Sequence, residues 1–428
     1  MSARDAAGAG PLVSLGSIFR IAARNLLRYR RRTLLTTLLV VIGVMSVLLF
    51  MALSGSFRAL MVGQITDSML GHLQVHRKGF LASVESLPLN MNMKPKLVER
   101  LEAELAARDD VAAFAPRLKF GAMFSNFTET SNIRITAVSP EREAIVVPLL
   151  PSRFAEGKPE GGLVVPGSIL VPELLARGMK VKVGDEVVLV ATNQDGSVNG
   201  RTFRVQGILE SMTGPGGRDG YIHLDDARTL LRMKEPEVSE FAIRLKDPSR
   251  AMTFTKELDR ELAEIKNPQG KPAFEVHGWQ ELTPFYNILR IIDIMTLAIQ
   301  FVLVSIVLVS VMNVMMMAVF ERVREIGTIA AIGTQPRTIL ALFLSEGLLL
   351  GLVGAGTGAL LSVAVVFVLN TVKVAFSFGR EDLVLAPTIS PESVLVVAAV
   401  VVGVAVLASL QPAWKAARMD PNTALRHV

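Results

Sequence analysis

The chain has 428 residues, half of them hydrophobic, with a mean hydropathy of +0.44 and a net charge of +6. Its apolar residues gather in long blocks, which excludes a purely soluble protein and indicates membrane spans of about 20 residues each. The absence of cysteine excludes disulfides, thiol nucleophiles and cysteine-ligated metals. Residues 1–33 hold seven arginines and one aspartate, which account for the whole charge excess. A basic cluster just before a membrane span usually marks the cytoplasmic side of that span. The positive charge is therefore explained without a nucleic-acid partner, and none is expected.

Residues 1–33 are predicted to be a cytoplasmic N-terminal segment. Within Ser14–Arg32, arginines recur at helical spacing opposite an apolar stripe that includes Ile18, Ala22 and Leu26. This pattern predicts an amphipathic helix in the headgroup plane of the membrane. A basic, partly ordered flank is the alternative.

Four apolar runs are long enough to cross a bilayer. They are Leu34–Leu53, Ile294–Phe320, Thr338–Val372 and Ser393–Pro412. We predict transmembrane helices at 34–57, 288–320 (with a stalk), 338–372 and 393–412. A cleaved signal peptide is the alternative for the first run, but that run is long for a signal core and 33 residues precede it.

The basic residues that flank these runs predict their orientation. Arginines precede the first run, basic residues lie in the linker 321–337, and others lie in the tail 413–428. All three segments belong inside if both ends are cytoplasmic. Residues 58–287 and the loop 373–392 then lie outside, as expected for a multi-pass protein of the bacterial inner membrane.

The external segment mixes helical and strand periodicity. Amphipathic helices are predicted over Lys96–Arg108 and Ala251–Ile265. Short strands are predicted at Ile133–Val138, Glu186–Val190, Phe203–Leu209 and Phe241–Leu245, separated by turns such as Gln194–Gly200 and Thr213–Gly220. The fold class is therefore an α-helical membrane protein with four transmembrane helices, one before and three after a large α+β extracytoplasmic domain.

Helically spaced apolar residues continue from Trp279 to Ile292, with no breaker after Pro284. They predict a stalk that runs directly into the second span and carries motion between domain and membrane. An ordinary juxtamembrane helix is the alternative.

No catalytic set is found. The sequence has no GxxxxGK[ST] phosphate loop and no GxSxG motif. His72 and His76 are the one close histidine pair, but their neighbours alternate as in a strand and no acid completes a ligand set. We expect no catalytic residue, no metal and no cofactor bound by this chain. Phe120, Met123, Phe124 and Phe127 fit a strand of the domain core better than an exposed surface that binds another molecule.

The third span carries one charge and a glycine pattern. Glu346 is interpreted as a polar contact that steadies the helix bundle, with proton coupling as the alternative. Gly347, Gly351, Gly354 and Gly358 fall on one helix face as two successive GxxxG units. Such a face lets another helix approach closely, within the subunit or across a dimer.

The linker between the second and third spans, Glu321–Ile339, reads as a short amphipathic helix followed by a Gly-Thr-Gln-Pro turn. A helix of this kind can bind a groove in a cytoplasmic partner. The linker residues Glu325, Ile326, Gly327, Gly333 and Arg337, the Glu346-Gly347 pair and PAWKAARMDPNTALR at Pro412–Arg426 resemble ABC-transporter permeases of the MacB/FtsX superfamily. The resemblance implies a MacB-like periplasmic core domain and a linker that couples to an ATPase through Glu321, Arg324, Glu325, Ile326, Gly327, Gly333 and Arg337.

Within that superfamily, Ile169–Val190 and the motifs FRVQGILES and DGYIHLDDARTLLRM look like lipoprotein-releasing (LolC/LolE-type) permeases. That likeness implies a cytoplasmic ATPase dimer that supplies ATP and Mg, a second identical or related permease, and a lipoprotein or other amphiphilic cargo. Permeases of this type that dock a periplasmic carrier have a longer, proline-bearing loop where this chain has only Ala191–Arg201. The resemblance therefore does not decide whether a periplasmic carrier docks on this chain. MacB-type efflux of drugs or peptides and an FtsX-like signalling scaffold are the rival functions.

Overall fold

The computed structural model describes residues 15–158, 161–212, 218–372, 375–378, 381–384 and 386–420. The first 14 residues, parts of the predicted turn 213–220 and loop 373–392, and the tail from 421 onward lie outside the described residues. The chain divides into two compact units, a membrane unit (Met1–Arg58 with Ile291–Val428) and a large domain (Ala59–Arg290).

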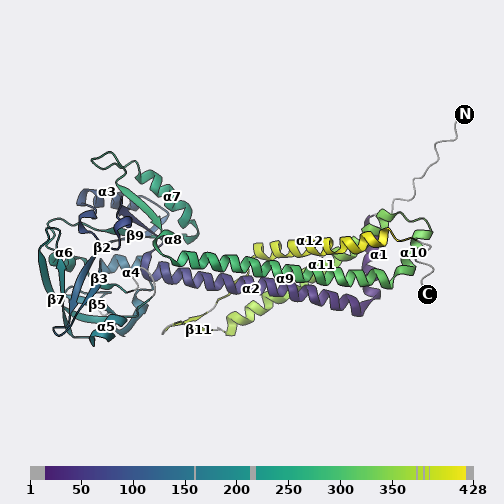
Figure 1. The fold of residues 1–428 in the computed structure, drawn as a ribbon, viewed down its shortest axis with the longest axis horizontal. Coiled ribbons are helices and arrows are strands. Elements are labelled where there is room, and N and C mark those ends of the chain that lie inside the picture. The colour runs from purple at the N-terminus through teal and green to yellow at the C-terminus, as the bar shows by residue number, and fades with distance from the viewer. Residues whose placement is uncertain are drawn as a thin grey trace. The chain divides into compact units, whose positions relative to one another are not determined.

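The described part of the membrane unit contains four helices long and apolar enough to cross a membrane, which confirms the predicted number of spans. These helices extend past the predicted apolar runs because their charged ends remain helical. The helices of this part of the chain, labelled in Figure 1, are α1 (Leu15–Arg28), α2 (Arg30–Ile65), α9 (Phe285–Glu321), α10 (Val323–Ala331), α11 (Pro336–Val372) and α12 (Pro391–Ala417). A hairpin of β11 (Ala375–Phe378) and β12 (Glu381–Val384) follows α11.

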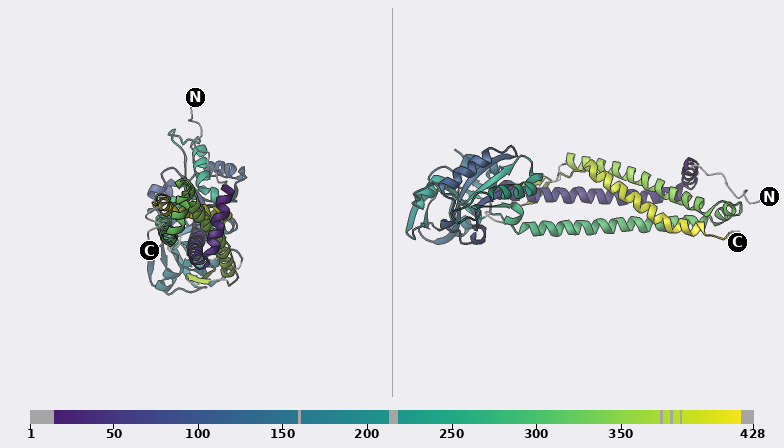
Figure 2. Two further views of the ribbon diagram at one scale, coloured as in Figure 1. Left: turned by 90° about the vertical axis from the view of Figure 1, so that its right-hand side faces the viewer. Right: turned by 90° about the horizontal axis from the view of Figure 1, so that it is seen from above.

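Helix α1 is separate from α2, with a break at Tyr29. Ile18 and Ala22 of its apolar stripe are buried, and α1 contacts α11. The predicted amphipathic helix is therefore present, but part of its apolar stripe packs on protein rather than facing lipid. Helices α11 and α12 run alongside each other, as Figure 2 shows.

The large domain is built on one mixed sheet with ten strands among the described residues, in the order β10-β1-β9-β2-β3-β8-β5-β7-β4, with β6 paired to β2 and β7. Its strands are β1 (Leu73–Arg77), β2 (Val111–Ser125), β3 (Thr130–Val138), β4 (Phe154–Gly157), β5 (Ser168–Pro172), β6 (Glu186–Thr192), β7 (Val198–Leu209), β8 (Gly220–His223), β9 (Glu240–Leu245) and β10 (Phe274–Gly278). Its helices are α3 (Pro95–Ala106), α4 (Pro140–Val146), α5 (Glu173–Met179), α6 (Leu224–Leu230), α7 (Ala251–Leu262) and α8 (Trp279–Leu282).

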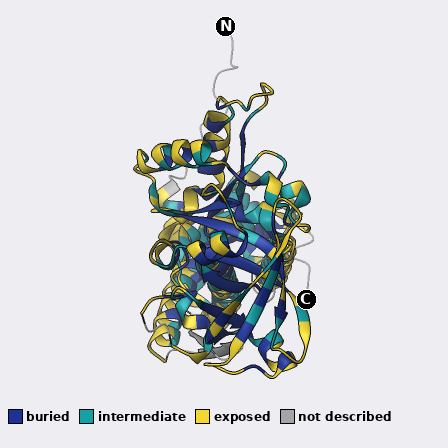
Figure 3. Ribbon diagram, turned by 90° about the vertical axis from the view of Figure 1, so that its left-hand side faces the viewer, coloured by how far each residue is buried: buried dark blue, intermediate teal, exposed yellow. Residues whose placement is uncertain are grey.

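Separate hydrophobic cores support the two ends of this sheet. One lies around Phe241 and Phe274 under α3 and α7, and another lies around Phe120 and Phe203 near α5 and α6. Figure 3 shows the central strands buried and the outer helix faces exposed. The predicted strands and helices of the domain are confirmed, with ends displaced by a few residues.

Three details correct the sequence analysis. The stalk residues Trp279–Ile292 do not form one helix: α8 ends at Leu282, Thr283 is extended, and α9 begins at Phe285, after Pro284. The physical reason is Pro284, whose ring forces the preceding residue out of the helical region. Strand β7 begins at Val198, inside the predicted turn Gln194–Gly200. Along β2 and its turn, Phe120 and Phe124 are core residues, whereas Met123 and Phe127 are exposed.

Candidate functional site

A buried ion pair joins the segment after α9 to α11. Nη1 of Arg322 donates a hydrogen bond to Oε1 of Glu346 at 3.0 Å, and the two side chains are 6% and 1% exposed. Nδ2 of Asn25, on α1, donates to the same oxygen at 2.9 Å. An unpaired carboxylate in a membrane helix costs about 3 kcal/mol or more. These donors explain how Glu346 is accommodated inside α11.

The same cluster holds α10 against the N-terminal helices. Glu325 accepts a hydrogen bond from Nε of Arg322 at 3.1 Å and from the Tyr29 hydroxyl at 3.3 Å. Arg32 pairs with Glu321 at 3.0 Å, and the Arg32 guanidinium lies over the Tyr29 ring. These contacts link Glu325 of α10 and the neighbouring residues Glu321 and Arg322 to Tyr29, Arg32 and Glu346.

Helix α10 has one face toward the protein and one face free of it. Ile326 and Gly327 are buried, whereas Ile332, just past the helix end, is 80% exposed. Arg324 and Arg337 are also exposed. The exposed side of this segment thus presents a large apolar side chain and two arginines.

The turn after α10 is built on a glycine. Gly333 has φ +97°, a left-handed conformation that ordinary side chains adopt at a cost. Its N–H donates to the carbonyl of Ala330, and the N–H of Thr334 donates to the carbonyl of Ile329. This arrangement satisfies the last carbonyls of α10, and Pro336 then starts α11. The predicted Gly-Thr-Gln-Pro turn is confirmed.

The glycines of α11 pack against two helices of the same chain. A Cβ added to Gly347 would collide with Ser409 of α12, and one added to Gly351 would lie 3.2 Å from Cα of Val402. We call the face formed by Gly347, Gly351, Gly354 and Gly358 the glycine seam. Its first two glycines pack against α12.

The second half of the seam receives α2. A Cβ on Gly354 would lie 2.8 Å from Cβ of Val40, and a Cβ on Gly358 would lie 2.8 Å from Cβ of Val44. One helix face thus contacts two partners in succession. Of the two arrangements left open by the sequence, the structure shows packing within the subunit.

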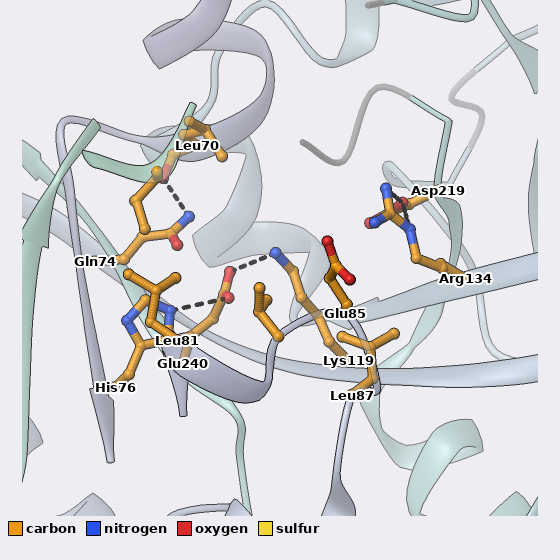
Figure 4. A pocket seen from close by; sticks show the side chains of 12 residues that line it. Leu70, Gln74, His76, Leu81, Glu85, Leu87, Lys119, Arg134, Asp219 and Glu240 are labelled. Atoms are coloured by element: carbon orange, nitrogen blue, oxygen red, sulfur yellow. Dashed lines mark hydrogen bonds and ion pairs between the residues drawn. The ribbon is translucent and has the colours of Figure 1, made fainter. Parts of the chain in front are cut away.

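The large domain contains a separate charged pocket of about 190 Å³, shown in Figure 4. Glu240 is at its floor, with Nζ of Lys119 at 3.1 Å and Nε2 of His76 at 3.4 Å. Arg134 and Asp219 form an ion pair at 3.1 Å on another wall. Four leucines, Val84, Gln74 and the carboxylate of Glu85 complete the lining, so the pocket has both apolar and charged walls.

The charges in this pocket are structural. Burial opposes ionisation of Glu240, but Lys119, the His76 hydrogen bond and Arg117 outweigh it and hold the pKa of Glu240 well below its usual range. A carboxylate so strongly held in its charged form is a poor general base. Within the part of the chain that the structure describes, no group of three or more potential metal ligands occurs.

His72 and His76 do not form a site together. Nδ1 of His72 accepts a hydrogen bond from the backbone N–H of Leu245 at 3.0 Å, and burial followed by the charge of Arg244 lowers the pKa of His72. His76, on β1, stacks on Phe80. The alternation that argued against a metal pair reflects strand β1.

The sequence analysis identified Glu346 but missed its partners Arg322 and Asn25. Arg322 was read only as a topology signal, and Asn25 was not singled out. The spacing of Asn25, Tyr29 and Arg32, one helical turn apart, was the available signal. The partners of the glycine seam on α2 and α12 had no signal in the sequence.

Four apolar helices, a large mixed α and β domain and a connector (residues 321–337) held by the ion pairs of Arg322 are the features of a polytopic membrane protein. The family models agree: the MacB-like periplasmic core domain matches residues 33–261, and the FtsX-like permease C-terminal region matches residues 297–421. Since the first match covers more than half of the chain, this protein belongs to the MacB/FtsX superfamily of ABC-transporter permeases.

Three relatives illustrate the range of that superfamily. The chain is 30% identical over 230 residues to the pyoverdine export ATP-binding/permease protein PvdT of Pseudomonas fluorescens, covering 52% of this chain but only 33% of that protein. It is 23% identical over 343 residues to the lipoprotein-releasing system transmembrane protein LolC of Neisseria meningitidis, covering 75% and 79%. It is 24% identical over 420 residues to the macrolide export ATP-binding/permease protein MacB of Campylobacter jejuni, covering 95% and 61%.

Proposed function

We propose that this chain is the permease subunit of an inner-membrane transporter in which a separate cytoplasmic ATPase binds the connector, and that its cargo is a lipoprotein to be released from the membrane. In this proposal both termini are cytoplasmic and the large domain is periplasmic. A second permease, identical or related, completes the membrane part, and the ATPase dimer holds ATP and Mg.

The observation that carries the coupling role is the connector itself. Ile332 is exposed at the end of α10, while Arg322 and Glu325 tie the other side of α10 to the bundle. A groove in an ATPase can cover the exposed side, and the buried side then transmits its movement to α11. The glycine seam allows α11 to slide close to α2 and α12 without side-chain interference.

The lipoprotein cargo is supported by the LolC relative, which is matched over 79% of its own length. The names of the PvdT and MacB relatives specify pyoverdine and macrolide export, so efflux of small amphiphiles is the competing function. An FtsX-like scaffold that moves no cargo is a further alternative. The three make different predictions when the protein is removed from cells.

The coupling test uses Ile332→Asp, with Ile145→Asp as the matched control. Both isoleucines are exposed, but Ile145 lies on α4 of the large domain. We expect an ABC ATPase to co-purify in mild detergent with wild type and with Ile145→Asp, and to be lost with Ile332→Asp. Retention of the ATPase by Ile332→Asp would reject the connector as its binding site.

The cargo test is depletion of the chain followed by membrane fractionation. If the chain releases lipoproteins, its depletion should cause acylated lipoproteins destined for the outer membrane to accumulate in the inner membrane. Re-expression of the chain should restore their transfer to the outer membrane. Normal sorting together with macrolide sensitivity or retained siderophore would replace this proposal with efflux. Normal sorting together with a cell-wall defect would favour the scaffold.

A further inference from the structure

A basic groove with a volume of about 1010 Å³ lies on the large domain, between the start of α3 and the loop that precedes β10. Its lining includes one carboxylate, Glu235, and six cationic side chains. The cations are Arg77, Lys78, Lys94, Lys96, Lys266 and Lys271. Such an excess of one charge in a concave surface concentrates the field and attracts anions.

The start of α3 reinforces this field. Lys94 is the N-cap of α3 and makes no side-chain cap, and the first turn of the helix has no acidic residue. Lys94 and Lys96 therefore place positive charge at the positive end of the helix dipole, which is unfavourable for an isolated helix. A bound anion reverses this penalty, because both lysines and the backbone N–H of Lys96 then face opposite charge.

Asn92 provides an independent observation. It lines the groove and is 2% exposed, and its Oδ1 accepts a hydrogen bond from Ser239. Its Nδ2 has no hydrogen-bond partner among the described residues. A buried amide donor without a partner is rare, because the missing hydrogen bond costs free energy. A ligand oxygen that accepted this hydrogen bond would recover that free energy.

The opposite wall is held in place by its own backbone. Oδ1 of Asn267 accepts hydrogen bonds from the N–H groups of Gln269 and Lys271, and the N–H of Asn267 donates to the carbonyl of Lys271 at 2.8 Å. Lys266 and Pro272 form a bridge at the base of this loop. Two of the lysines are thus presented by an ordered turn across from α3.

We propose that this groove binds a phosphate-bearing anion with more than one negative charge. Lysines act as point charges for phosphate, and a helix N-terminus is the backbone element that most often binds it. The head group of an anionic phospholipid and a soluble phosphate compound present the same chemistry. The groove is at the upper end of the size range of small-ligand sites, so it accepts either. This inference does not depend on the cargo proposed above.

The test is isothermal titration calorimetry of the full chain in phosphatidylcholine nanodiscs with inorganic pyrophosphate. We expect saturable binding that weakens with salt. The variant Lys96→Glu/Lys271→Glu should bind about a hundredfold more weakly, because each lost charged hydrogen bond is worth about tenfold. The control Lys246→Glu/Lys256→Glu makes the same charge change on exposed lysines outside the groove and should bind as wild type does.

Two further variants separate loss of the site from loss of folding. Lys94→Gln/Lys96→Gln and Lys266→Gln/Lys271→Gln each remove two positive charges of exposed groove side chains without reversing them. Both should weaken pyrophosphate binding while the thermal unfolding of the chain stays close to wild type. Absence of saturable binding by wild type, or equal loss in the Lys246→Glu/Lys256→Glu control, overturns the proposal.

Competition then identifies the source of the phosphate. Monomeric short-chain phosphatidic acid, whose phosphate monoester can carry two negative charges, assigns the groove to a lipid head group if it displaces pyrophosphate and binds more tightly. Displacement that is weaker than pyrophosphate itself assigns it to a soluble phosphate compound. A polyglutamate peptide that binds more tightly than either probe rejects the phosphate assignment in favour of an acidic protein segment.

Discussion

Arg322 and Glu346 form a buried ion pair at 3.0 Å across 24 positions of sequence, linking the connector to the third membrane helix. Removing one partner leaves an uncompensated buried charge, which costs about 3–5 kcal/mol. We therefore expect Arg322→Ala and Glu346→Ala to lower the unfolding temperature in detergent strongly. The double variant Arg322→Met/Glu346→Met should recover most of the loss.

The control for this pair is Arg58→Ala, which breaks the Arg58–Asp293 ion pair. Both of its side chains are about half exposed, so the cost should be about 1 kcal/mol or less. Equal destabilisation by Arg58→Ala and Arg322→Ala would contradict the special role of the buried pair.

The glycine seam gives a second prediction. Gly347→Ala and Gly358→Ala place a methyl group against Ser409 and Val44, and such overpacking costs about 1–3 kcal/mol. Gly356→Ala on the same helix meets nothing within 4 Å and should leave stability unchanged or slightly raised. Thermal unfolding of the three variants provides the comparison. Adding Ser409→Gly to Gly347→Ala should restore stability if direct contact is the cause.

The turn at Gly333 gives a third prediction. At φ +97°, Gly333→Ala should strain the end of α10 by about 1–2 kcal/mol. The strain displaces the exposed Ile332, so co-purification of the ATPase should fall while the large domain unfolds as in wild type. Gly403→Ala, in α12 with open space around it, is the matched control. Unchanged ATPase retention in Gly333→Ala would show that the turn does not position the contact.

The large domain should lose stability as pH rises. Burial opposes protonation of His277, but the carboxylate of Glu275, 3.6 Å from Nε2, and that of Glu281, 2.8 Å from Nδ1, outweigh it and raise the pKa of His277. Protonation of His277 therefore stabilises the fold fully below pH about 6.5 and progressively less as pH rises through the raised pKa. The pKa of His72 is lowered, so its titration changes stability only below pH 6.5. It therefore does not offset the loss of stability above that pH. Thermal unfolding across pH should show a decline that His277→Gln abolishes.

The same cluster predicts acid sensitivity. Burial opposes ionisation of Glu275, but His277 and the N–H groups of Gly79 and Leu81 outweigh it and lower the pKa of Glu275 to about 2. Its contribution, up to about 3 kcal/mol, is present above pH 4.5 and is lost as pH falls toward 2. Glu275→Gln should remove this loss together with part of the stability at neutral pH. An acid limb of the melting profile that persists unchanged in Glu275→Gln would assign it to other groups.

Much of the architecture was predictable from local pattern. Unbroken apolar runs identified the four spans, because each must bury its whole length in lipid. Strict alternation in β3 and β6, and four-residue spacing in α3, identified elements of the large domain. Pro284 was noted in the sequence, but the extended conformation of Thr283 before it was not predicted, since the apolar spacing continues across both residues.

Composition, hydropathy and charge thus determined by themselves the number of membrane helices, the presence of one large mixed domain and the position of the connector, because these depend on interactions with solvent, with lipid or within one helical turn. Only the tertiary structure decided that Glu346 pairs with Arg322 and Asn25, that α11 glycines receive α12 and then α2, and that six cations line one groove. These features join residues far apart in the chain, and their geometry depends on packing that no local periodicity encodes.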